Sequence, residues 1–120
     1  MKKHAIDIEE KEGILFLRMR DHEVGPEQAE SLNAVVAQKA GPGVHAVVIN
    51  FSAVDYLSSL FLSALIEISK ELRAKKVKFG LAHLCDKMLE LLKVTKLDTV
   101  FTIFGDSYQA YTALAKKESK

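Results

Sequence analysis

The period of the hydrophobic pattern changes repeatedly along this chain, and that constrains the fold most. Residues His45 to Phe51 (HAVVINF) form an almost continuous apolar run, typical of a parallel strand covered on both faces. From Ser58 to Lys75 the apolar residues recur with a helical period, whereas Lys76 to His83 alternate between polar and apolar as in a strand. A strand, a helix and a strand in succession predict a crossover unit with parallel strands.

The flanking segments extend this pattern. Ile14 to Arg20 predicts a half-buried strand, and Ala5 to Ile8 is expected to pair with it as a hairpin that turns through Glu9–Gly13. Further elements are predicted as a helix from Pro26 to about Gly41, a helix over Asp86–Thr95, a short strand over Val100–Phe104 and a last helix capped by Asp106 or Ser107. We therefore expect an α/β domain with a mixed, mainly parallel sheet of about four or five strands and about four helices.

Length, charge and cysteine content limit the number of domains, the kinds of partner and the cellular location. The 120 residues fit one domain, and 17 Lys+Arg against 16 Asp+Glu give a net charge of +1, which offers no overall basic field for nucleic acid or a membrane surface. The single cysteine, Cys85, excludes an intrachain disulfide and fits a reducing compartment. No apolar run approaches the roughly 20 residues of a membrane span. The N-terminus turns acidic where a signal peptide would need its apolar core. We expect one cytoplasmic domain over residues 1–120, with Lys116–Lys120 frayed.

The sequence lacks the usual signatures of catalysis. It has no glycine-rich phosphate loop, no His-x-x-x-His pair and no nucleophile paired with a base. Cys85 precedes a predicted helix, and a small half-buried role is favoured over a reactive thiol. We therefore predict a protein that is not an enzyme and that binds neither a cofactor nor a metal.

One segment stands out, the run from Val47 to Leu65. A buried strand leads through a turn into Ser58-Ser59 and then into an apolar helix. Serine is a preferred N-cap because its hydroxyl accepts a hydrogen bond from an unpaired backbone N–H, and one serine suffices for that purpose. The other is then left free at the positive end of the helix dipole, where a phosphate is tolerated. Helix capping alone is also a sufficient explanation of the pair.

The same segment resembles the signature of the STAS family, the domain of anti-sigma factor antagonists. The matching residues are Tyr56 to Leu62 (YLSSLFL), and a second match lies at Leu91 to Phe101 (LLKVTKLDTVF). The resemblance implies a single STAS-like domain, a small sheet with helices packed mostly on one side. In the second match Lys96 replaces a glycine at a position that favours a left-handed backbone.

The resemblance also implies a function. Antagonists of this family bind an anti-sigma factor that is a serine kinase, which frees a sigma factor for transcription without direct contact of the antagonist with nucleic acid or membrane. The kinase phosphorylates a serine at the start of the second helix and so ends the interaction, and a phosphatase restores it. Matched to the motif, the acceptor is Ser59, with Ser58 beside it.

Two departures from the family pattern affect the expected partner surface. Leu60 and Phe61 stand where the family has a small residue and a glycine, and Arg20 to Val24 lacks the usual Gly-x-Leu-Asp loop. We expect Phe61 to be exposed as an anchor for the partner, in a stripe with Ala64 and Ile68; a wide buried helix face explains this stripe equally well. The expected partner-binding residues are Asp21, His22, Glu23, Tyr56, Ser58, Ser59, Leu60, Phe61, Ala64 and Ile68.

The departures leave an alternative open. Some STAS domains serve as scaffolds or accompany transport systems without phosphorylation, and self-association as a homodimer belongs to that reading. The core stripe expected on the Ser58–Lys75 helix, comprising Leu62, Leu65, Ile66, Ser69 and Leu72, is common to both interpretations.

Overall fold

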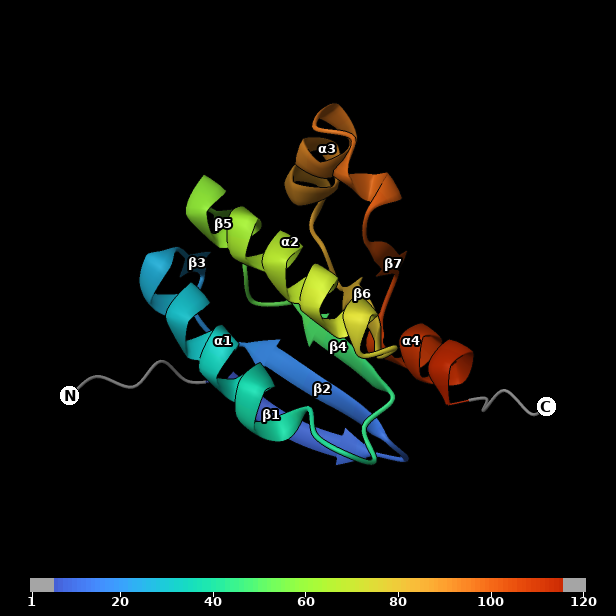
Figure 1. Ribbon diagram of the computed structural model, residues 1–120. Coiled ribbons are helices and arrows are strands. Elements are labelled where there is room, and N and C mark those ends of the chain that lie inside the picture. Colours follow the sequence, from blue (N-terminus) through green and yellow to red (C-terminus); the bar gives the residue numbers. More distant parts are fainter. Residues whose placement is uncertain (1–5, 116–120) are drawn as a thin grey trace.

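The computed structural model describes residues 6–115 and forms one α/β domain around a five-stranded mixed sheet (Figure 1). Its strands are β1 (Ile6–Lys11), β2 (Ile14–Met19), β3 (Glu23–Val24), β4 (Ala46–Asn50), β5 (Tyr56–Leu57), β6 (Lys78–Ala82) and β7 (Thr102–Phe104). Its helices are α1 (Pro26–Lys39), α2 (Ser59–Ala74), α3 (Asp86–Val94) and α4 (Ser107–Leu114), with a 3-10 turn at Leu97–Thr99. The predicted strand start at Ala5 and the predicted fraying of Lys116–Lys120 lie outside the described residues.

The sheet has the order β1-β2-β4-β6-β7. β1 pairs with β2 as the predicted antiparallel hairpin, and β2, β4, β6 and β7 run parallel to one another. The hairpin turn is tighter than the predicted Glu9–Gly13, because β1 continues to Lys11 and only Glu12 and Gly13 make the turn, with φ angles of 53° and 81°. Positive φ at both positions produces a two-residue turn that matches the twist of the strands.

The helices cover the two faces of the sheet unequally. One face packs against α1, α2 and α3 through Leu15, Leu17, Val47, Ile49 and Leu81. The opposite face carries a smaller cluster against α4, built from Ile14, Ala46, Val48, Ala82 and Ala110. Both faces of β4 are therefore buried, as its continuous apolar sequence predicts. The expectation that the helices lie mostly on one side is confirmed, with α4 as the exception.

The buried face of α2 is wider than the predicted stripe: Leu62, Leu65, Ser69 and Leu72 are buried as predicted, and Phe61 and Ile68 are buried with them. Its centre is Phe61, Leu65, Ile68 and Leu72, spaced four, three and four residues apart, and each is at most 1% exposed. The predicted exposure of Phe61 and its stripe partner Ile68 is therefore wrong. Phe61 contacts Phe51 edge to face, with ring centroids 6.2 Å apart. Ile66, placed in the core stripe from sequence, is only partly buried because it lies at the margin of this face.

A second, very small sheet pairs β3 with β5 in parallel, Glu23 opposite Tyr56 and Val24 opposite Leu57. These two-residue strands were not predicted. Together they join the loop before α1 to the loop before α2, so the two helices begin side by side (Figure 1).

Candidate functional site

The first residues of α2 include two serines with different environments. Ser58 is the N-cap, and its hydroxyl oxygen accepts a hydrogen bond from the Phe61 backbone N–H at 3.1 Å. Ser59 is the first helical residue and is exposed. Within residues 6–115 its hydroxyl makes no hydrogen bond. The structure thus confirms that one serine caps the helix while the other remains available to solvent.

The small sheet places the loop before α1 beside these serines. The Val24 carbonyl accepts a hydrogen bond from the Ser58 N–H at 3.0 Å, and the His22 carbonyl accepts one from the Asp55 N–H at 2.9 Å. The His22 ring lies with Nδ1 3.1 Å from the Ala53 carbonyl oxygen. Because a carbonyl only accepts, Nδ1 carries the proton in this contact. The structure therefore brings His22 and Glu23, in the loop before α1, next to Tyr56 and Ser58 before α2.

Gln28 is a residue of this site that the sequence reasoning missed. Its side-chain oxygen accepts a hydrogen bond from the Gly25 N–H at 2.8 Å, and its side-chain nitrogen donates to the Asp21 carboxylate at 2.8 Å. Gln28 is the third residue of α1, and a glutamine at this position commonly returns to the backbone N–H of the cap. The signal was therefore present in the Gly-Pro-Glu-Gln sequence at the start of the helix.

Leu60 supplies the exposed apolar side chain that Phe61 does not. Its side chain is 56% exposed, as is that of Tyr56 in β5. Leu60 lies at a groove of about 390 Å³ between α1 and α2, whose walls include Pro26, Ala29, Glu30, Ala64 and Glu67. Ala64, expected at the partner surface, is half-buried and lines this groove. An apolar docking point thus adjoins Ser59.

The surroundings of Ser59 are acidic. From Asp21 to Glu67 the chain carries six carboxylates (Asp21, Glu23, Glu27, Glu30, Asp55 and Glu67) and one basic residue of the Lys/Arg type, Lys39. Lys39 is the last residue of α1, at the opposite end of that helix from Pro26. Glu30 and Glu67 line the Leu60 groove itself. A surface of this kind favours a partner with basic side chains.

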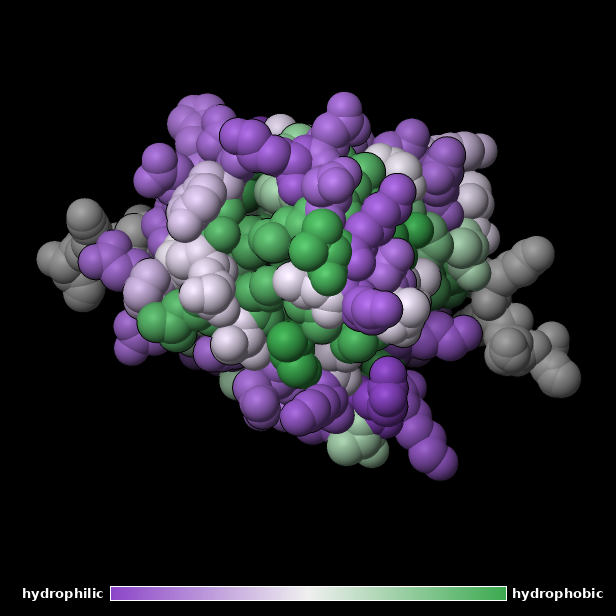
Figure 2. Space-filling model, turned by 90° about the horizontal axis from the view of Figure 1, so that it is seen from above, coloured by the Kyte–Doolittle hydropathy of each residue, from purple (hydrophilic) through white to green (hydrophobic). Residues whose placement is uncertain are grey.

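A separate apolar surface lies on α3. Figure 2, which looks onto the side uppermost in Figure 1, shows hydrophobic side chains gathered at the centre within a rim of hydrophilic ones. The exposed apolar residues of α3 are Leu91 and Val94. No residue of α3 lines the Leu60 groove.

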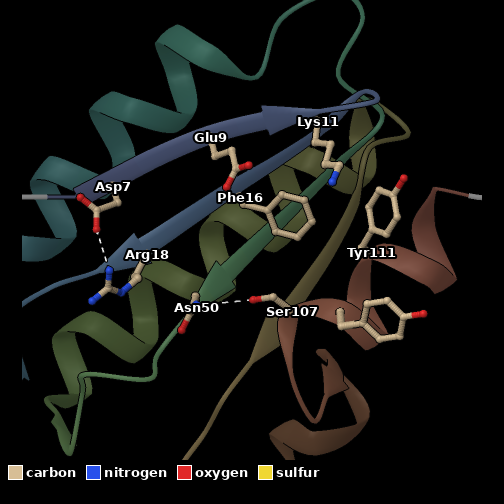
Figure 3. A pocket seen from close by; sticks show the side chains of 9 residues that line it. Asp7, Glu9, Lys11, Phe16, Arg18, Asn50, Ser107 and Tyr111 are labelled. Atoms are coloured by element: carbon tan, nitrogen blue, oxygen red, sulfur yellow. Dashed lines mark hydrogen bonds and ion pairs between the residues drawn. The ribbon is translucent and has the colours of Figure 1, made fainter.

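The sheet face beside α4 carries another hollow, of about 450 Å³ (Figure 3). Its charges are largely paired with neighbouring groups: the Arg18 guanidinium lies 2.9 Å from the Asp7 carboxylate, and the Lys11 ammonium lies 4.9 Å from the centre of the Tyr111 ring. Hydrogen bonding to the Glu12 carboxylate raises the pKa of Tyr111 above its ordinary value. With opposite charges compensated, this hollow presents no net charge for a ligand.

Comparison with known proteins identifies the family. The family model of the STAS domain matches residues 5–110. The chain belongs to the STAS domain family. No curated protein matches this chain. Within residues 6–115 of this STAS domain, no helix combines the length and apolar character needed to cross a membrane. The same residues hold no group of three or more His, Cys, Asp or Glu side chains arranged for a metal ion.

Solved structures share the whole fold of this STAS domain. A proposed anti-sigma factor antagonist from Thermotoga maritima has a TM-score of 0.83 at 19% identity, covering 92% of this chain and 95% of that one. An anti-sigma factor antagonist from Mycobacterium paratuberculosis has a TM-score of 0.77 at 25% identity, with 92% of each chain covered. The anti-sigma factor antagonist SpoIIAA in its unphosphorylated form has a TM-score of 0.70 at 13% identity, covering 95% of this chain and 100% of that one.

Proposed function

We propose that this STAS domain is a regulatory binding module of the anti-sigma factor antagonist type. It acts in the cytoplasm, carries out no catalysis and binds an anti-sigma factor that is also a serine kinase. Its partner surface consists of Asp21, His22, Glu23, Tyr56, Ser58, Ser59, Leu60 and Ala64. The observation that carries this proposal is the exposed Ser59 hydroxyl at the first position of α2, beside a helix cap that Ser58 already supplies.

Phosphorylation of Ser59 is the proposed switch. A phosphate adds about −1.5 to −2 charges at neutral pH, and the N-terminus of a helix is a favourable place for them. Because Ser58 makes the capping hydrogen bond, modification of Ser59 leaves that bond in place. SpoIIAA is known in both an unphosphorylated and a phosphorylated form, which supports a reversible switch in this kind of domain. A phosphatase removes the group and restores binding.

The acidic surroundings indicate how the phosphate ends the interaction. A partner suited to the carboxylates around Ser59 is basic, so negative charge alone does not repel it. The phosphate instead acts through its bulk, because it stands beside Leu60 and obstructs the apolar contact that Leu60 makes with the partner. We therefore expect bulk to matter more than charge at position 59.

The test is incubation with the cognate anti-sigma kinase and ATP, followed by mass spectrometry of the peptides. We expect one phosphate on Ser59, lost in Ser59→Ala and retained in Ser63→Ala, an exposed serine one turn further along α2. We also expect Ser59→Asp and the larger, uncharged Ser59→Gln to lower affinity for the kinase, both more than Ser59→Ala does. Absence of phosphate from Ser59, together with unchanged affinity of Ser59→Asp and Ser59→Gln, would reject the switch.

A further inference from the structure

A second groove lies at the opposite end of α2 from Ser59. It measures about 600 Å³ and is bounded by the C-terminal end of α2, the start of β6, the edge strand β7 and the end of α4. Its nearest lining residues on α2, Ser69 and Arg73, lie about 15 Å and about 21 Å from Ser59 along the helix axis, at about 1.5 Å per residue. Nothing in the proposed function uses this groove.

The rim of this groove is cationic. Arg73, Lys76 and Lys78 contribute to its wall, all three are exposed, and no carboxylate is among the residues that line it in the described part of the chain. Basic residues at the end of a helix commonly compensate its dipole, which accounts for Arg73. The helix dipole does not account for Lys78, because Lys78 belongs to β6. Lys76 has a left-handed backbone (φ 63°), a conformation that favours glycine, so backbone geometry does not account for a lysine there.

The groove has an apolar floor on the side of the sheet that faces α4. Phe104 and Leu114 pack against the α4 cluster there, and Val100 leaves 39% of its surface exposed. Phe79 lines the groove from the opposite face, where it packs edge to face on Phe101 with ring centroids 6.1 Å apart. Gly80 allows the Phe104 ring to lie against the sheet, since a Cβ at residue 80 would come within 2.6 Å of the ring carbon Cε2. Packing of this kind fixes the aromatic floor in place, so a ligand does not have to order it.

A groove with an apolar floor and a cationic rim is complementary to a molecule that has both an apolar part and an anionic group. We propose that this groove binds an amphiphilic anion, a molecule with a single apolar chain and a carboxylate or phosphate head. The chain lies over Val100, Phe104 and Leu114, and the head contacts Arg73, Lys76 and Lys78. The volume falls within the usual range for small-molecule sites, about 300–1,000 Å³.

The test uses the full chain and dodecanoate below its micelle-forming concentration, with binding followed by 1H–15N NMR. We expect saturable binding that shifts amide signals of the α2 C-terminus, β6 and β7, and no saturable binding of acetate or dodecanol, which lack the chain or the charge. The double variant Arg73→Glu/Lys78→Glu is expected to weaken dodecanoate binding about tenfold or more. Val100→Asp, which places a carboxylate in the groove at an exposed position, is expected to do the same.

A matched control separates the groove from general charge. Lys70→Glu/Lys75→Glu changes the net charge equally at the same end of α2, but neither residue lines the groove, so dodecanoate affinity is expected to stay within about twofold of the unchanged protein. Equal weakening by the two double variants would overturn the proposal. So would shifts confined to another surface, binding only to anionic vesicles, or equal binding of a poly-glutamate peptide. None of these outcomes bears on the switch at Ser59.

Discussion

At the scale of single residues, Leu60 and Phe61 show what the sequence leaves open. Consecutive helical positions point about 100° apart, so one of two adjacent apolar residues can be fully buried while the other is exposed. Leu60 is 56% exposed and Phe61 is 0% exposed. Which of them faces the core depends on the rotation of α2 about its axis, which is set by the cap at Ser58 and the Phe51 contact. By contrast, the left-handed backbone expected at Lys96 is confirmed by a φ of 64°.

Truncation of these two side chains should therefore have opposite effects on stability and binding. We expect Phe61→Ala to lower the free energy of unfolding by about 3–5 kcal/mol, because it removes a packed aromatic ring from the core. Leu60→Ala should change that free energy by no more than about 0.5 kcal/mol but weaken partner binding. Urea denaturation measures the first quantity and calorimetric titration with the kinase the second. A similar loss of stability in both variants would contradict the placement of Leu60.

At the scale of elements, long periodic segments were predictable and very short ones were not. The apolar run of β4 and the helical period of α2 each extend over enough residues to show their pattern. β3 and β5 contain two residues each, too few to show any period, and they exist because the chain pairs Glu23–Val24 with Tyr56–Leu57 more than thirty residues away. The serine motif was thus visible in the sequence, whereas its apposition to Asp21–Glu23 depends on tertiary structure.

The start of α2 offers a second test, because two adjacent serines have different structural roles. Ser58→Ala removes the side-chain cap and is expected to lower the free energy of unfolding by about 1 kcal/mol. Ser59→Ala removes a hydroxyl that bonds to nothing in residues 6–115 and improves helix propensity, so it should leave stability unchanged or raise it by about 0.5 kcal/mol. Urea denaturation of both variants distinguishes them. Equal destabilisation would mean that Ser59 shares the cap and is not free for modification.

At the scale of the whole molecule, a net charge of +1 conceals a separation of charge. Asp21 to Glu67 holds six carboxylates and one lysine, whereas the following stretch from Lys70 to Lys78 holds five basic residues and one carboxylate, Glu71. Most of the first group lies on α1 and in the loops that precede α1 and α2, and the second lies at the C-terminal end of α2 and the start of β6, so the local charge differs between the two ends of α2. Composition could not reveal this, because the total averages over both groups.

This separation of charge predicts how the proposed complex with the kinase depends on salt. Attraction between an acidic surface and a basic partner accelerates encounter and is screened over about 10 Å at 0.1 M salt, so the association rate should fall as ionic strength rises. Glu30→Lys/Glu67→Lys reverses two charges in the Leu60 groove and should slow association about tenfold at low salt. The single variant Glu71→Lys, at the basic end of α2, serves as the control and should leave the rate nearly unchanged. Stopped-flow measurements at two ionic strengths give the association rate for each variant. If the rate is the same at both ionic strengths and in Glu30→Lys/Glu67→Lys, the partner binds elsewhere, because charges beside the contact alter the approach of a basic surface.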